Sequence, residues 1–108
     1  MLDNVHLIIL CPTLHYFFIP GDARDSLSEK GNGMMFSTKD ADNDNGGRHC
    51  AVRYTGAWWY KNCHHSNLNA QYLRGKHTSY GAGVEWDKWK GEYYSLKKTE
   101  MKIRPRSF

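Results

Sequence analysis

Residues 40–64 read DADNDNGGRHCAVRYTGAWWYKNCH and combine clustered carboxylates, two cysteines and a Trp-Trp-Tyr run. Asp40, Asp42 and Asp44 alternate with small or amide residues, so a tight loop can turn several oxygen atoms towards one point. Hard cations such as calcium prefer ligands arranged in this way. The two cysteines then bracket a segment rich in glycine and aromatic residues, as the ends of a short disulfide loop do. The stretch therefore predicts a cation-binding loop next to a disulfide.

The acidic pattern alone leaves two interpretations open, a solvated acidic turn and a metal site. It does not fit an EF-hand: counting from Asp40, position six is Asn45 where glycine is needed, and position twelve is Ala51 where glutamate is needed. Zinc is the competing ion, because two cysteines and three histidines lie within residues 49–65. The cysteines are 13 residues apart, however, and structural zinc sites favour the short Cys-x-x-Cys step.

Four blocks follow one another along the chain: FSTKDADND at 36–44, HCAVRYTGAWWYKNCHHSNLN at 49–69, YLRGKHTSYGAGVEW at 72–86 and YSLKKTEMKIRP at 94–105. Together they resemble the C-terminal part of a fibrinogen-related domain of the ficolin and tachylectin type. The resemblance implies an α+β, loop-rich fold with short strands and few short helices. It also implies an incomplete central sheet, because the family builds that sheet largely from sequence upstream of these blocks.

The resemblance divides the chain into a non-family apolar segment at 1–20 and a partial fibrinogen C-terminal-like domain at 21–108. The apolar segment lacks a basic start and an Ala-x-Ala cleavage pattern, so it is a poor signal peptide. Pro12 and His15 interrupt it, which also disfavours a membrane span. Two explanations remain: an abnormal start, as in a truncated isoform, a mispredicted exon or a partial gene, and a divergent secretion signal.

Length, cysteine count and charge narrow the class of protein. A chain of 108 residues has room for one small domain with a limited core. Three cysteines allow one disulfide and one remaining thiol, and the expected pair is Cys50 with Cys63, which leaves Cys11 free. A disulfide and an extracellular family both predict secretion. The net charge of +4 comes from dispersed basic residues, which indicates a solvated surface and no nucleic-acid face.

The resemblance implies a set of calcium ligands in the acidic loop. They are the side chains of Asp42 and Asp44 and the backbone carbonyls of Gly46 and Arg48, with Asp40 in support. The carbonyl ligands make no demand on residue type, so the identities of residues 46 and 48 do not test this assignment.

The resemblance also implies a pocket for an acetyl group beside the second cysteine. In the family the peptide bond before that cysteine is cis, and the backbone N–H groups of Cys63 and His64 then point together towards an acetyl oxygen. Tyr54, His77 and Tyr80 match the positions that line this pocket. Their rings suit the C–H surfaces of sugars and acetyl groups. A half-buried strand tyrosine is the alternative for Tyr54.

Local patterns predict four features of secondary structure. Residues 21–33 form a surface loop with at most one helical turn, and residues 51–54 form a short strand. Trp86 and Trp89 lie on one face of a helical turn. Residues 99–105 form a strand, because apolar and charged residues alternate there.

Two departures from the family pattern bear on the pocket. Ala70 replaces a glycine, which matters if that backbone needs a positive φ, and Gly81 replaces the common alanine after Tyr80. The four tryptophans are assigned to packing.

The leading hypothesis is calcium-dependent recognition of acetylated or carbohydrate ligands, as in lectins of innate immunity. The alternatives are a protein-interaction domain like those of the extracellular matrix, fibrinogen or tenascins, and a truncated fragment without independent function. Catalysis is not expected, because no nucleophile–base order or cofactor motif occurs. No nucleic-acid partner or membrane insertion is expected either. A homo-oligomer is compatible with the sequence, although the chain contains no collagen-like or coiled-coil region.

Overall fold

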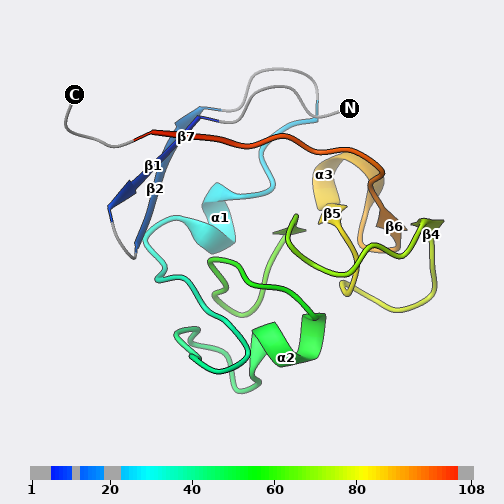
Figure 1. Ribbon diagram of the computed structural model, residues 1–108, viewed down its shortest axis with the longest axis horizontal. Helices are drawn as coiled ribbons and strands as arrows, with labels where there is room; N and C mark the ends of the chain where they lie inside the picture. The colour runs from blue at the N-terminus through cyan, green and yellow to red at the C-terminus, as the bar shows by residue number, and fades with distance from the viewer. Residues whose placement is uncertain (1–5, 11–12, 19–22, 105–108) are drawn as a thin grey trace.

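The computed structural model describes residues 6–10, 13–18 and 23–104, with side chains for residues 23–101, and most of its course is loop (Figure 1). The regular elements in these ranges are short. They are β1 (His6–Leu10), β2 (Thr13–Phe18), α1 (Ser28–Gly31), α2 (Cys50–Tyr54), β3 (Ser66–Asn67), β4 (Gly75–Lys76), β5 (Glu85–Trp86), α3 (Asp87–Lys90), β6 (Tyr94–Ser95) and β7 (Lys102–Arg104). The α+β, loop-rich class with short strands and few short helices is therefore confirmed.

The strands form three small sheets. One has the order β2-β1-β7, with β1 antiparallel to β2 and parallel to β7. The others are the antiparallel pairs β3-β5 and β4-β6. The strand predicted for the C-terminal tail is confirmed at β7, which is shorter than the pattern indicated.

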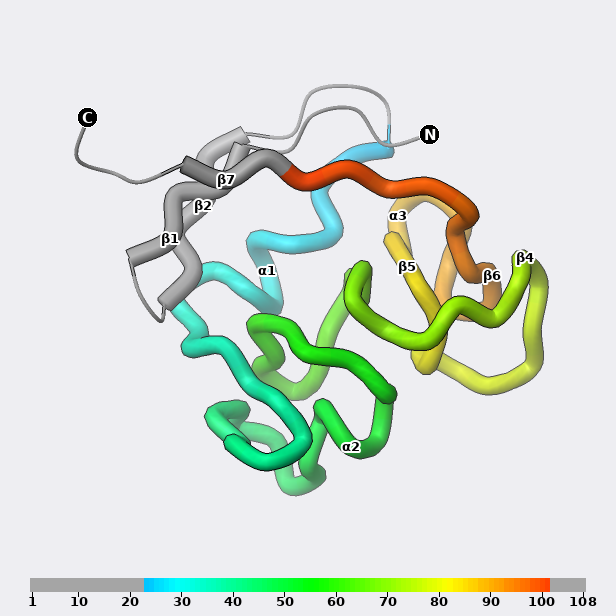
Figure 2. Tube along the Cα trace, viewed as in Figure 1, coloured from blue at the N-terminus to red at the C-terminus, as the bar shows by residue number. Residues whose placement is uncertain are grey.

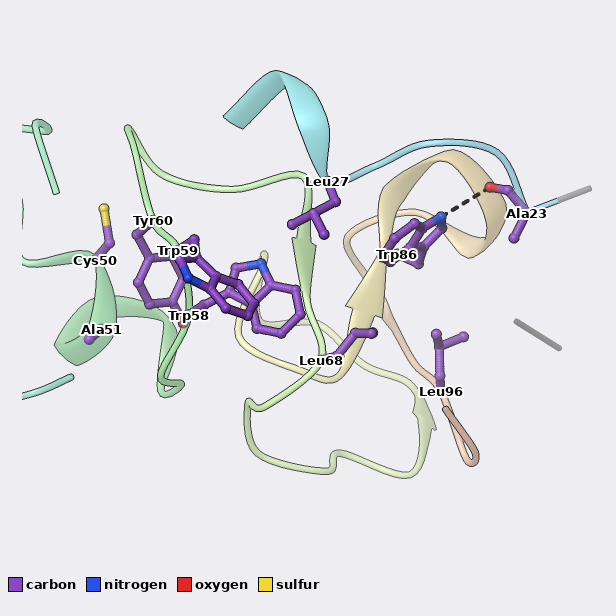
Figure 3. Close-up of a cluster of buried hydrophobic side chains, with 10 residues drawn as sticks. All are labelled: Ala23, Leu27, Cys50, Ala51, Trp58, Trp59, Tyr60, Leu68, Trp86 and Leu96. Atoms are coloured by element: carbon purple, nitrogen blue, oxygen red, sulfur yellow. Dashed lines mark hydrogen bonds between the residues drawn. The ribbon is translucent and has the colours of Figure 1, made fainter. Parts of the chain in front are cut away.

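The core combines four large aromatic side chains with alanine, leucine and cysteine (Figure 3). Its members are Ala23, Leu27, Cys50, Ala51, Trp58, Trp59, Tyr60, Leu68, Trp86 and Leu96. The ring centroids of Trp58 and Trp59 are 5.1 Å apart. The indole N–H of Trp86 contacts the backbone carbonyls of Ala23 and Arg24 at 3.1 and 2.7 Å, which ties the loop before α1 to β5. These contacts confirm the packing role predicted for these three tryptophans, and Trp89 packs partly buried against the same cluster.

The strand predicted at 51–54 is wrong, because these residues belong to helix α2. The backbone N–H of Cys50 donates to the Asp44 carboxylate at 2.9 Å, and the N–H of Arg53 donates to the His49 carbonyl at 2.9 Å. The first bond satisfies a donor that a helix start leaves unpaired. The helix ends at Thr55, which has a left-handed backbone with φ of 68°. Hydrogen bonds of the folded chain thus determine the helical conformation of residues 51–54, where apolar and polar residues alternate only weakly.

The other two local predictions are confirmed only in part, and the predicted surface loop places Ala23 and Leu27 in the core. The loop after residue 22 contains one helical turn, α1, and Asp25 accepts hydrogen bonds there from the N–H groups of Leu27 and Ser28. The helical turn predicted for Trp86 and Trp89 is α3, but it contains only Trp89, because Trp86 has an extended backbone and belongs to β5. Gly91, with φ of 79°, follows the end of α3. In the described residues, no helix is long and apolar enough to cross a membrane.

Asparagine side chains hold much of the irregular backbone. The amide of Asn67 donates to the carbonyls of Tyr54 and Gly81 at 3.0 and 3.1 Å. The amide of Asn69 donates to Ala57 O at 3.0 Å. Figure 2 shows the acidic loop and the β4-β6 pair at well-separated places on the trace, with the segment after α2 between them.

Candidate functional site

The acidic loop gathers its carboxylates through its own backbone. The N–H of Asp44 donates to the Asp42 carboxylate at 3.1 Å. The Asp44 carboxylate in turn accepts from the N–H groups of Gly46 and Cys50 at 3.1 and 2.9 Å. Side-chain donor atoms of Asp42, Asp44 and His49 lie within 4.8 Å of one another. The loop thus places two carboxylates side by side at the start of α2.

This arrangement fits a calcium ion. Hydrogen bonds, chiefly with Asp44, lower the pKa of Asp42, whereas burial and the adjacent Asp42 raise the pKa of Asp44. Two close carboxylates repel each other, and a cation between them removes that cost. Within the described chain, the carbonyls of Gly46 and Arg48 accept no backbone hydrogen bond, so both oxygens are available to a cation. Asp40 lies on the exposed side and accepts a hydrogen bond from Thr38 Oγ1 at 2.6 Å.

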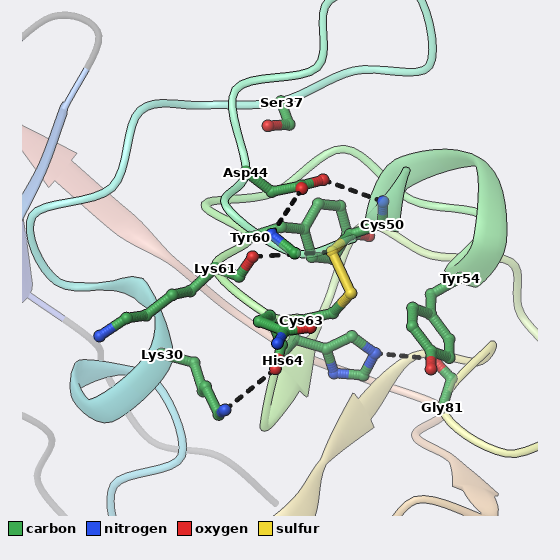
Figure 4. Close-up of a disulfide and its surroundings, with 12 residues drawn as sticks. Lys30, Ser37, Asp44, Cys50, Tyr54, Tyr60, Lys61, Cys63, His64 and Gly81 are labelled. Carbon is green, nitrogen blue, oxygen red and sulfur yellow. Dashed lines mark hydrogen bonds between the residues drawn. A yellow bond between two sulfur atoms is a disulfide. The ribbon is translucent and has the colours of Figure 1, made fainter. Parts of the chain in front are cut away.

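A disulfide links this loop to the next segment (Figure 4). Cys50 and Cys63 are bonded with an S–S distance of 2.06 Å, as predicted. The peptide bond between Asn62 and Cys63 is cis. The bonded sulfurs are not thiolates, which rules out the zinc site considered for these two cysteines. The disulfide joins the first residue of α2 to the wall of a neighbouring pocket.

That pocket has a volume of about 530 Å³. It brings together four of the five residues predicted to bind ligand: Tyr54, Cys63, His64 and Tyr80. It is also lined by residues that the sequence did not single out as ligand contacts. These are Lys30, Gly47, Arg48, Asn62 and His65.

The aromatic wall of the pocket is built edge to face. The Tyr54 ring lies 5.0 Å from the ring of His64 and 6.5 Å from the ring of Tyr80, measured between centroids. Tyr93 continues this row, with its ring centroid 5.5 Å from that of Tyr80. Burial raises the pKa of Tyr80, so its hydroxyl stays protonated. Tyr93 could not be found from sequence, because its place follows from the turn between α3 and β6.

His64 forms the inner wall. Its Nε2 lies 2.9 Å from the carbonyl oxygen of Gly81, and only 3% of its side chain is exposed. Burial lowers the pKa of His64 to about 4. The ring is therefore neutral at pH 7, and because a carbonyl only accepts, Nε2 carries the proton. Figure 4 shows the imidazole between the disulfide and Gly81.

His77 is placed away from this pocket. Its Nε2 lies 2.9 Å from Oε2 of Glu85, and 8% of its side chain is exposed. It does not line the pocket, and its predicted ligand role remains a prediction. His65 is half-buried, and its Nδ1 lies 3.5 Å from the Glu29 carboxylate.

The two departures from the family pattern have different outcomes. Among the described residues other than glycine, positive φ occurs at Arg24, Thr55 and Arg74. Ala70 therefore does not need the glycine it replaces. Gly81, by contrast, has φ of +70°, and a Cβ there would lie 3.1 Å from the Tyr54 ring and 3.3 Å from His64 Nε2.

We expect Gly81→Ala to lower the free energy of unfolding by about 1–2 kcal/mol, because an L side chain is strained in the left-handed region. The added methyl group also presses on Tyr54 and His64. Urea unfolding followed by tryptophan fluorescence measures the change. Gly47→Ala is the control, since a Cβ at Gly47 meets nothing within 4 Å. Equal stability of Gly81→Ala and the wild type would contradict the strained geometry.

The sequence of this chain is similar to a known protein family and to individual relatives. The family described as "Fibrinogen beta and gamma chains, C-terminal globular domain" matches residues 13–106. Fibrinogen C domain-containing protein 1-B of Xenopus laevis is 63% identical over 86 residues, which cover 80% of this chain and 19% of the relative. Techylectin-5A of Tachypleus tridentatus is 53% identical over 95 residues, which cover 88% of this chain and 32% of the relative. The chain thus spans about a fifth of the length of the first relative.

Solved structures show the same fold. The fibrinogen-like globe domain of human ANGPTL6 superimposes with a TM-score of 0.72 at 42% identity, over 79% of this chain and 39% of that domain. Lamprey fibrin D-dimer, complexed with the peptide Gly-His-Arg-Pro-amide, gives a TM-score of 0.69 at 28% identity, over 78% of this chain and 33% of the other.

Proposed function

The chain belongs to the family of fibrinogen C-terminal globular domains, and from this membership we propose that it is a non-enzymatic module that recognises acetylated or carbohydrate ligands with the support of calcium. The ligand site is the pocket beside the disulfide. Tyr54 and Tyr80 provide its aromatic wall, and His64 its inner surface.

The pairing of unused backbone donors with an aromatic wall carries the proposal. In the described chain, neither the N–H of Cys63 nor that of His64 donates a backbone hydrogen bond, and both residues line the pocket. Two adjacent N–H groups can hold the partial negative charge of an acetyl oxygen. The tyrosine rings can then cover the acetyl methyl group and the C–H face of a sugar.

Calcium would support this site through the acidic loop. Asp42 and Asp44, with the carbonyls of Gly46 and Arg48, would hold the ion. Its charge would stabilise the turn whose next residues, Gly47 and Arg48, line the pocket. Asp44 also binds the N–H of Cys50, and Cys50 is bonded to Cys63. An ordered loop therefore fixes two walls of the pocket.

The relatives add support of a coarser kind. Techylectin-5A is a lectin by name, and it matches most of this chain. The disulfide is compatible with an oxidising compartment. We therefore place the proposed recognition outside the cell.

Peptide recognition is the second candidate. The lamprey fibrin D-dimer structure contains a bound Gly-His-Arg-Pro-amide peptide. Polar side chains that could bind a peptide also line the pocket, among them Lys30 and Asn62. Nζ of Lys30 lies 3.0 Å from the backbone carbonyl of Asn62. A peptide that competes with an acetylated sugar for binding would place both ligands in one site.

Tyr80→Ala is expected to weaken binding to immobilised N-acetylglucosamine about tenfold, because it removes part of the aromatic wall of the pocket. The Tyr80 ring is exposed and supports little of the core, so the variant should still fold. The measurement is retention on the beads with calcium, with elution by EDTA or by the free sugar. Tyr72→Ala is the matched control, since Tyr72 is 49% exposed against 56% for Tyr80 and does not line the pocket.

Retention that ignores EDTA and the free sugar, or equal binding of Tyr80→Ala and the wild type, would exclude the lectin function. Displacement by Gly-His-Arg-Pro-amide alone would favour the peptide candidate. Unfolding of Tyr80→Ala without a separate loss of binding would make Tyr80 a core residue.

A further inference from the structure

Behind the pocket, His64 meets two buried carboxylates, Glu85 and Glu92, that the proposed function does not use. His64, Glu85 and Glu92 come from the segment after the disulfide, from β5 and from the turn before β6. One donor atom of each lies within 4.8 Å of the others. Their residues are 8%, 0% and 7% exposed. Two carboxylates so deeply buried carry a large cost unless something compensates their charge.

Each of the three side chains has an unpartnered atom. These are Nδ1 of His64, Oε1 of Glu85 and both carboxylate oxygens of Glu92. Nδ1 of His64 comes to 3.7 Å from Oε1 of Glu92, which is too far for a hydrogen bond. Buried polar atoms are almost always paired, so these atoms are candidates to hold either a bound ion or a proton shared between the two glutamates.

The other atoms of the cluster are already engaged, which leaves the free ones poised as ligands. The proton on Nε2 of His64 is directed to the Gly81 carbonyl, so Nδ1 carries a lone pair. Oε2 of Glu85 accepts from the N–H of Gly83 at 3.0 Å and lies 2.9 Å from Nε2 of His77. Metal-binding histidines and carboxylates are typically held by outer hydrogen bonds of this kind.

We propose that His64 Nδ1, Glu85 Oε1 and Glu92 bind a divalent transition-metal ion, with zinc as the ion that best fits one imidazole and two carboxylates. Zinc takes such ligands at roughly 2.0–2.2 Å and commonly keeps an open position beside three protein ligands. Calcium prefers six to eight oxygen atoms, which three side chains including an imidazole do not supply. A +2 ion neutralises the two carboxylates while His64 remains neutral.

The titration of the cluster agrees with this geometry. Burial raises the pKa of Glu85 and of Glu92. The Glu92 carboxylate raises the pKa of Glu85 further, whereas the pKa of Glu92 is raised by Asp87 and lowered by its side-chain interaction with Glu85. Burial lowers the pKa of His64. In the absence of a metal, a proton between the two glutamates is the competing way to remove the charge. The two states differ in metal content, which the experiment measures.

The experiment distinguishes a metal ion at this cluster from a cation in the acidic loop and from a ligand in the pocket. The full chain is dialysed against zinc chloride and then against buffer with a weak chelator, and its zinc content is measured by mass spectrometry. We expect the wild type to retain one more zinc per chain than Glu92→Gln. We also expect bound zinc to raise the melting temperature of the wild type by about 10 °C at a large excess over Kd, with no such rise in Glu92→Gln. Glu29→Gln, an identical change at a glutamate whose side chain is 70% exposed, is the matched control and should behave as the wild type does.

Two further measurements keep the outcome decisive. Glu85→Gln replaces Glu92→Gln if the latter does not fold. X-ray absorption at the zinc edge of the wild type should show nitrogen and oxygen ligands near 2.0–2.2 Å and no sulfur. Equal zinc content in the wild type and both variants would put the ion elsewhere and overturn the proposal. A wild type that retains no zinc, with Glu92→Gln at least as stable, would establish the shared proton instead.

Discussion

Removal of the Cys50–Cys63 disulfide is expected to lower the free energy of unfolding by about 3 kcal/mol, the value for a loop of this length in the chain-entropy model. The effect is large relative to total stability because the described core is small. The double variant Cys50→Ser, Cys63→Ser should also lose ligand binding, since Cys63 lines the pocket. Urea unfolding of the oxidised wild type and of the double variant measures the difference.

Cys11→Ser is the control for this experiment. The bridge joins Cys50 and Cys63, so replacing the third cysteine should leave the unfolding midpoint unchanged. A double variant with the same midpoint as the wild type would show that the bridge contributes nothing. A loss caused by Cys11→Ser instead would point to a different cysteine chemistry in solution.

Calcium is expected to raise the melting temperature of the wild type, and Asp42→Asn to abolish that rise. A ligand at 100 times its Kd stabilises the folded state by about 2.7 kcal/mol, which corresponds to roughly 10 °C or more for a domain of this size. Asp42 is chosen because it is exposed and accepts one backbone hydrogen bond. Asp44, by contrast, also supports the start of α2 through Cys50. Thermal melts with calcium and with EDTA measure the shift.

Asp40→Asn provides the matched control, because Asp40 is in the same loop but is expected only to support it. It should retain most of the calcium-dependent shift. An identical shift in Asp42→Asn and the wild type would remove Asp42 from the site. A wild type without a cooperative transition in either condition would mean that the chain does not fold alone.

Much of the family assignment could be made from the sequence. The four ordered blocks identify the fold class, and the two cysteines of residues 40–64 are bonded as expected. These features are local in the chain: a disulfide loop, an acidic turn and a run of tryptophans are each written in consecutive residues. Four predicted ligand residues also meet in one pocket, because three of them lie close to the disulfide in sequence or are fixed by it.

Other features could not be read from the sequence because they depend on contacts between distant segments. Residues 51–54 became helical through hydrogen bonds at the start of α2, although their alternation indicated a strand. His77 matched a pocket position but lies against Glu85.

The sequence alone determined the family, the disulfide partners and the composition of the acidic loop, since each rests on the identity and order of nearby residues. Only the tertiary structure decided how Glu85 and Glu92 meet His64 behind the pocket. No spacing pattern in the sequence predicts that these three residues lie together. That arrangement follows from the packing of β5 and the turn before β6 against the segment after the disulfide. Because the three side chains are buried, the charge of the two carboxylates must be compensated by a bound ion or by a proton.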